Sequence, residues 1–87
     1  MTYTVQIMAS ALKALGRLSR ADQERIRDRV DALAFGPRPA GVAKMSGTEA
    51  LYRIRAGDYR VVYQVRDEAL LVLVIRIGHR KDVYRQH

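Results

Sequence analysis

Residues 51–65 read LYRIRAGDYRVVYQV, and this stretch decides the fold. Two runs rich in Val, Ile, Tyr and Arg flank the dipeptide Gly57-Asp58, which is typical of a two-residue hairpin turn. Leu51–Ala56 and residues 59–65 are therefore expected to be antiparallel strands. A third strand is expected over residues 69–77, because ALLVLVIRI is almost entirely apolar.

The first half of the chain shows one strand pattern and then two helix patterns. Apolar and polar residues alternate over 3–7, as in a half-buried strand. Residues 10–18 have helical spacing, with an apolar stripe of Ala11, Leu12, Leu15 and Leu18. A second helix is expected over 21–35, because Ser19 supplies an N-cap and Gly36-Pro37 supplies a stop.

These patterns predict an α+β fold of one domain spanning residues 1–87. It consists of one N-terminal strand, a helical hairpin and then a three-strand antiparallel meander, with both helices packed on one face of the sheet. A short extended piece is expected at 42–45. The last strand is apolar on both faces, so it is expected to lie inside the sheet. A second core does not fit in a chain this short.

The charge balance indicates an anionic partner. Sixteen Lys and Arg against nine Asp and Glu give a net charge of +7, which favours nucleic acid first and an acidic protein second. The absence of Cys excludes a zinc ribbon and a thiol nucleophile, and two His disfavour a histidine metal cage, so no metal and no cofactor are expected. The aliphatic run 69–75 is far shorter than the roughly 20 residues of a membrane span. A cytoplasmic protein without a membrane partner is predicted.

The hairpin register gathers arginines on one face of the sheet. With the turn at Gly57-Asp58, Arg55 faces Arg60, and Arg53 lies on the same face. A three-residue turn after the second strand would place Arg76 opposite Arg60, whereas a two-residue turn would send it under the helices. We expect the former, because a charge under the helices would be costly.

An empty sheet gains nothing from these arginines. Like charges directly opposite on paired strands cost up to about 1 kcal/mol, and a bound anion would offset that cost. Arginine is the side chain best suited to bidentate phosphate contacts. The alternative is a solvated basic face that only keeps the sheet soluble. Because four arginines converge, we favour anion binding.

The string over 51–65, the following residues VIRIGHR over 74–80 and the late Tyr84 resemble the RelE toxins of the RelE/ParE superfamily of bacterial toxin–antitoxin modules. The resemblance covers nearly the whole chain. It implies an endoribonuclease (a hydrolase termed an mRNA interferase) that cuts mRNA in the ribosomal A site without a metal. In that chemistry the ribose 2′-hydroxyl attacks the adjacent phosphate, leaving a 2′,3′-cyclic phosphate and a 5′-hydroxyl. The implied partners are the ribosome, mRNA and a small acidic antitoxin.

The resemblance also implies roles for individual residues. Arg60 and Arg80 would contact the scissile phosphate, and Tyr84 would serve as acid or base. The remaining RNA-binding candidates are Arg53, Arg55, Arg76 and Lys81.

The chain departs from the family pattern at two positions. Arg53 and Arg55 stand where the best-known members have lysine. A lysine can transfer a proton after a pKa shift, whereas an arginine stays protonated. Arg53 and Arg55 are therefore expected to clamp phosphate and not to act as a base. Other proton-transfer candidates are Asp82, Glu49 and His79, the last expected in an exposed loop.

Two further functions remain open from the sequence. One is a ParE-like inhibitor of DNA gyrase with the same fold and no nuclease chemistry. The other is a catalytically decayed module that binds RNA or an antitoxin, which the two lysine-to-arginine departures keep in play. Tyr84 has a structural alternative as well, because its ring can pack on the sheet edge.

Overall fold

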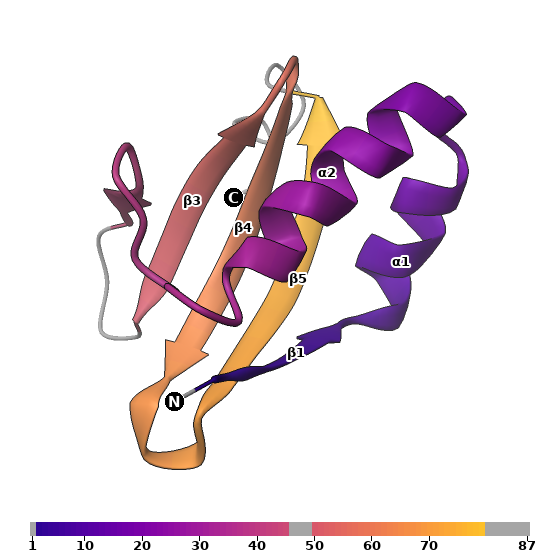
Figure 1. Cartoon of the computed structure of the whole chain (residues 1–87). Coiled ribbons are helices and arrows are strands. Elements are labelled where there is room, and N and C mark those ends of the chain that lie inside the picture. Colours follow the sequence, from indigo (N-terminus) through magenta and orange to yellow (C-terminus); the bar gives the residue numbers. More distant parts are fainter. Residues whose placement is uncertain (1, 46–49, 80–87) are drawn as a thin grey trace.

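The computed structural model describes residues 2–45 and 50–79. It shows a five-stranded sheet with two helices on one face (Figure 1), which confirms the predicted α+β fold. The strand order is β1-β5-β4-β3-β2. The elements are β1 (Thr4–Ile7), α1 (Ala9–Gly16), α2 (Arg20–Ala32), β2 (Ala43–Lys44), β3 (Leu51–Ala56), β4 (Tyr59–Arg66), a 3₁₀ turn (Asp67–Ala69) and β5 (Leu71–His79).

The two edge strands of the sheet, β1 and β2, differ in direction and length. β1 pairs in parallel with the first half of β5, from Thr4 opposite Leu71 to Ile7 opposite Val74. This pairing places β5 between β1 and β4, inside the sheet as predicted. At the other edge, the expected extended piece forms the two-residue strand β2 beside β3.

The second helix begins at Arg20, one residue before the predicted start, and ends earlier than predicted. The Ser19 hydroxyl accepts a hydrogen bond from the Asp22 N–H at 3.2 Å, which confirms the N-cap. The prediction that the helix continues to residue 35 is wrong, because α2 ends at Ala32. From Leu33 to Phe35 each N–H donates to the carbonyl three residues earlier, at 3.0 to 3.1 Å. These are the tighter bonds of a 3₁₀ turn.

The core lies between the helices and the sheet face they cover. Its largest fully buried side chains are Tyr63, Leu15, Ile26, Leu33, Ile54, Val61, Val72 and Val74. The Tyr63 hydroxyl donates to the Pro37 carbonyl oxygen at 2.6 Å, and burial raises the pKa of Tyr63 to about 12. Tyr63 is therefore a core residue, while Tyr59, at the start of β4, is half-buried.

The connection from β4 to β5 differs from the prediction. The loop contains four residues, because Leu70 follows the 3₁₀ turn in a left-handed conformation with φ 48°. Arg66 pairs with Leu71, so an uninterrupted ladder would bring Arg76 opposite Val61 on the helix-covered face. A β-bulge at Ile75 adds one residue to β5 and pairs Arg76 with Val62 instead. Arg76 therefore stays on the open face, as expected, but opposite Val62 and not Arg60.

A polar clasp joins four segments at the opposite end of the sheet from the hairpin turn. The Asp67 carboxylate accepts hydrogen bonds from the Tyr3 hydroxyl at 2.6 Å and from Arg38 Nη2 at 2.8 Å. Arg38 Nε in turn donates to the Tyr52 hydroxyl at 2.9 Å. The hydrogen bond from Arg38, followed by that from Tyr3, holds the pKa of Asp67 below its usual value.

We expect this clasp to make stability depend on pH. Since the pKa of Asp67 is lowered by folding, its contribution is complete above the unfolded value of about 3.9 and is lost as pH falls through the folded value. Urea unfolding at pH 6 and at pH 2.5 measures this. Asp67→Asn should destabilise the protein at pH 6 and much less at pH 2.5, with the exposed neighbour Glu68→Gln as the matched control. An equal loss at both pH values would contradict the prediction.

Candidate nucleic-acid interface

The open face of the sheet carries four arginines in two adjacent rows. Their positions follow from the strand pairing, which gives the row Arg53–Val62–Arg76 and the row Arg55–Arg60–Gly78. We call Arg53, Arg55, Arg60 and Arg76 the arginine face. Because neighbouring strands lie about 4.8 Å apart, all four side chains start within reach of one extended polyanion. None of these six positions is acidic.

Arg60 occupies the central strand of this face. Its Nη1 atom is buried and has no hydrogen-bond partner among the described residues. An unsatisfied buried donor costs about 1–3 kcal/mol, and more when it is charged. A phosphate oxygen would satisfy this donor and neutralise its charge. Arg60 thus carries a charged donor that no group among the described residues satisfies.

The hairpin turn that sets Arg55 opposite Arg60 depends on a glycine. Gly57 has φ 63°, and a Cβ there would lie 2.8 Å from Nη1 of Arg25 on α2. The turn therefore tolerates no larger residue without strain. Arg55 Nε donates to the Gly57 carbonyl oxygen at 3.2 Å, which directs the side chain toward the hairpin end.

Only some of the predicted site residues lie among the residues that the structure describes. The structure brings together the four members of the arginine face. Arg80, Lys81 and Tyr84 lie outside the described residues, as do Asp82 and Glu49. The expectation of a loop position for His79 is wrong, because His79 is the last residue of β5. It pairs with Tyr59 across the sheet, and the two rings meet edge-on with centroids 5.8 Å apart.

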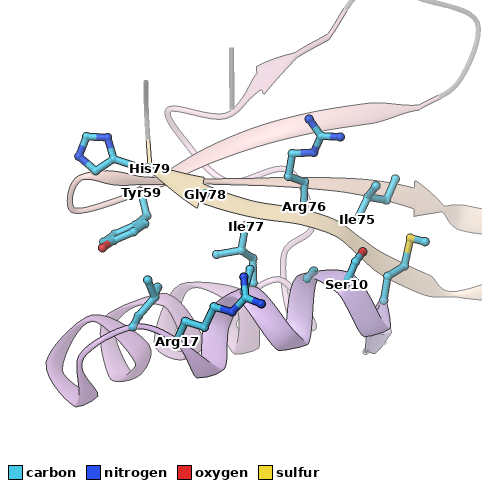
Figure 2. Close-up of a pocket in the computed structure, with 12 residues that line it drawn as sticks. Ser10, Arg17, Tyr59, Ile75, Arg76, Ile77, Gly78 and His79 are labelled. Carbon is cyan, nitrogen blue, oxygen red and sulfur yellow. The ribbon is translucent and has the colours of Figure 1, made fainter. Parts of the chain in front are cut away.

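Sequence reasoning missed a groove of about 710 Å³ between α1 and the second half of β5. β1 pairs with β5 only as far as Val74, so the strand continues past its neighbour and leaves a space against the helix. Figure 2 shows Ser10 of α1 and Arg17, the residue that caps the end of α1, directed toward the strand, while Arg76 projects from β5 to the other side. The apolar periodicity of a sequence does not predict such a groove, because the groove depends on where α1 and β5 move apart in space.

One aromatic residue of the groove has a raised pKa. Burial, then the nearby Asp22, raises the pKa of Tyr59 above its usual value. Within residues 2–45 and 50–79, no three His, Asp or Glu side chains gather as a metal-binding cluster. Over the same residues, no helix has the length and apolar character to cross a membrane.

Comparison with known proteins identifies relatives along nearly the full chain. The family model described as the ParE toxin of the type II toxin–antitoxin system parDE matches residues 5–84. Toxin RelG of Mycobacterium tuberculosis is 34% identical over 99% of this chain and 100% of its own length. The mRNA interferase toxin RelE of Escherichia coli K12 is 32% identical, covering 99% of this chain and 94% of the relative. The archaeal RelE–RelB complex of Pyrococcus horikoshii contains a chain with a TM-score of 0.84 and 36% identity, over 92% of this chain and 97% of that one.

Proposed function

This chain belongs to the RelE/ParE superfamily of type II toxin–antitoxin toxins, and from that premise we propose that it is a RelE-type toxin that cleaves mRNA on the ribosome. The relative from Escherichia coli K12 is named an mRNA interferase. The supporting observation in this chain is the arginine face, in which a buried Arg60 nitrogen has no partner among the described residues. Four arginines without an intervening acid suit a phosphate backbone.

The proposed reaction is attack by a ribose 2′-hydroxyl on the adjacent phosphate. Negative charge grows on the phosphate oxygens in the transition state, and fixed cations aimed at it lower the barrier. Arg60 and Arg80 are proposed to supply that charge. As the bond from the 2′-oxygen to phosphorus forms, the bond from phosphorus to the 5′-oxygen breaks and a 2′,3′-cyclic phosphate results. The 2′-hydroxyl loses one proton and the leaving 5′-oxygen gains one, and Tyr84 is proposed to act as the base or the acid in this exchange.

The other arginines are proposed to hold the RNA. Arg53 and Arg76 lie in one row, on either side of Val62, and Arg55 lies at the hairpin end. Since arginine makes two parallel hydrogen bonds to a phosphate and does not release its proton, these residues act as clamps. Lys81 is proposed to extend the same contact.

The proposed partners follow from the family and the charge. A chain of net charge +7 attracts an acidic protein as well as RNA. The Pyrococcus horikoshii relative was solved as a RelE–RelB complex. We propose a cognate acidic antitoxin for this chain, and the cytoplasm, where ribosomes reside, as its place of action.

A second candidate function is inhibition of DNA gyrase, because the matching family model is named for ParE. The two activities separate in paired assays. Purified toxin is added to ribosomes carrying a defined mRNA, and in parallel to gyrase with relaxed plasmid. Cleaved mRNA with normal supercoiling supports the proposed function, whereas intact mRNA with blocked supercoiling assigns the chain to the gyrase inhibitors.

We predict that RNA binding falls steeply with salt. Each phosphate neutralised by an arginine releases counterions, with a slope of about −0.7 per contact for single strands. Four contacts would therefore weaken affinity by about 50-fold between 50 mM and 200 mM salt. Fluorescence anisotropy with a labelled single-stranded RNA measures this slope. An affinity unchanged over that range would contradict the proposal that the arginine face binds RNA phosphates.

We predict that cleavage does not require a metal ion. The proposed chemistry uses only arginine and tyrosine side chains, so EDTA should leave the rate within about twofold once ribosomes are kept intact by polyamines. The rate is followed on pre-assembled toxin–ribosome complexes. A loss of cleavage that Mg²⁺ alone restores at constant ribosome integrity would contradict this prediction.

A further inference from the structure

We infer that the groove between α1 and the free end of β5 is a nucleotide subsite, which takes the base of a nucleotide next to the one held at Arg60. The inference rests on the proposed function and adds to it a source of base preference. The groove encloses about 710 Å³, within the range of 300–1,000 Å³ typical of small-molecule sites.

The lining of the groove suits a nucleobase. Tyr59 and His79 form an aromatic wall at one end, with their rings edge-on. Ile77 and Ala11 supply an apolar floor, and both line the space. In Figure 2, Tyr59 and Ile77 project from the sheet toward the helix, while Arg17 projects from the helix toward the sheet. Unpaired RNA bases are commonly bound by stacking on aromatic rings and arginine planes.

Gly78 connects this groove to the arginine face. It pairs with Arg60 across the sheet, and its backbone also lines the groove. Because residue 78 has no side chain, only the backbone of one strand separates the two surfaces at this point. Since β1 pairs with β5 only as far as Val74, an RNA strand with a phosphate on Arg60 can pass over this part of β5 and place the next nucleotide in the groove.

The groove also offers polar groups that can bind a nucleotide. The Arg17 guanidinium offers hydrogen-bond donors to base oxygens and nitrogens or to a phosphate, and the Ser10 hydroxyl offers both a donor and an acceptor. Both residues line the groove. An acidic peptide is the competing occupant. RNA is favoured because Gly78 both pairs with Arg60 and lines the groove, and because one wall is aromatic.

The first test is a titration of the purified toxin with each of the four nucleoside 5′-monophosphates, followed by ¹H–¹⁵N NMR. We expect saturable shifts of the Arg17, Tyr59 and Gly78 amides, with at least one base bound more tightly than the others. Arg17→Ala should weaken that binding by about 5–20-fold. Lys13→Ala is the matched control, because Lys13 is exposed on α1, one turn before Arg17, and does not line the groove.

Three outcomes of this titration overturn the inference. The first is the absence of shifts in the groove, and the second is an equal response to inorganic phosphate, which would indicate a bare anion site. The third is a response confined to an acidic peptide taken from the cognate antitoxin, which would make the groove a protein-docking surface.

A cleavage assay separates this inference from the proposed function. Ribosomes are programmed with mRNAs that differ only in the bases flanking the cut, and single-turnover rates are compared. Arg17→Ala should reduce the spread of rates among these mRNAs at least threefold, and Lys13→Ala should leave it unchanged. An unchanged spread with Arg17→Ala overturns the inference and leaves the proposed function intact. If the unaltered toxin cuts no mRNA, the proposed function fails, and the nucleotide titration alone decides the subsite.

Discussion

Replacing Arg60 by alanine is expected to slow mRNA cleavage by about 10²–10³-fold, since removing one preorganised charge from a transition state typically costs this much. Arg60 lies on the central strand of the arginine face. Its buried Nη1 has no partner among the described residues, so nothing else there competes for this donor. The loss should appear in the cleavage step at saturating toxin. Ribosome binding should weaken only a few-fold, because Arg53, Arg55 and Arg76 remain.

Two further variants sharpen this expectation. Arg60→Lys keeps the charge and loses the planar fork, so it should restore part of the rate. Arg27→Ala removes the same charge from the exposed side of α2 and should cleave at the unaltered rate. Circular dichroism confirms that each variant folds. If Arg60→Ala cleaves normally while its ribosome affinity collapses, Arg60 is a binding residue, and the charge acting on the transition state comes from elsewhere.

Replacing Tyr84 by phenylalanine is expected to cost about 10²–10⁴ in the cleavage rate, which is the usual range for losing a general acid or base. Only one hydroxyl is removed, so the fold should stay intact. The pH–rate profile should lose the limb that belongs to the tyrosine. Single-turnover cleavage on programmed ribosomes between pH 6 and 9 measures both effects.

The matched controls for Tyr84 are Arg53→Lys and Arg55→Lys. As clamps, these positions lose bidentate contacts and should bind RNA somewhat more weakly, with the pH–rate profile unmoved. If Tyr84→Phe cleaves at the parent rate while Arg53→Lys shifts the profile, proton transfer belongs to the strand pair. In that case the arginines would be acting where the family's lysines act.

Local turn chemistry makes much of the arginine face predictable from the sequence. A two-residue turn at Gly57-Asp58 allows only one hairpin register, and that register aligns Arg55 with Arg60, as the structure confirms. Alternation then separates the arginines from the core residues Ile54 and Val61. These predictions succeed because each depends on a few adjacent residues.

The predictions that failed depend on longer-range geometry. The four-residue loop and the bulge at Ile75 compensate one another, and neither leaves a pattern that alternation detects. The cost of burying a charge predicts only their combined effect, which is that Arg76 stays on the open face. The early end of α2 could not be predicted from the apolar pattern either. The turn from Leu33 to Phe35 buries Leu33 just as a continued helix would, so the pattern does not distinguish the two.

The measurement that tests the central claim most directly is the end-group analysis of mRNA cut by this toxin on programmed ribosomes in EDTA with polyamines. Attack by the ribose 2′-hydroxyl predicts a 2′,3′-cyclic phosphate on the upstream fragment and a 5′-hydroxyl on the downstream one, both absent with Arg60→Ala at matched times. A 3′-hydroxyl with a 5′-phosphate would indicate attack by water and would contradict the account.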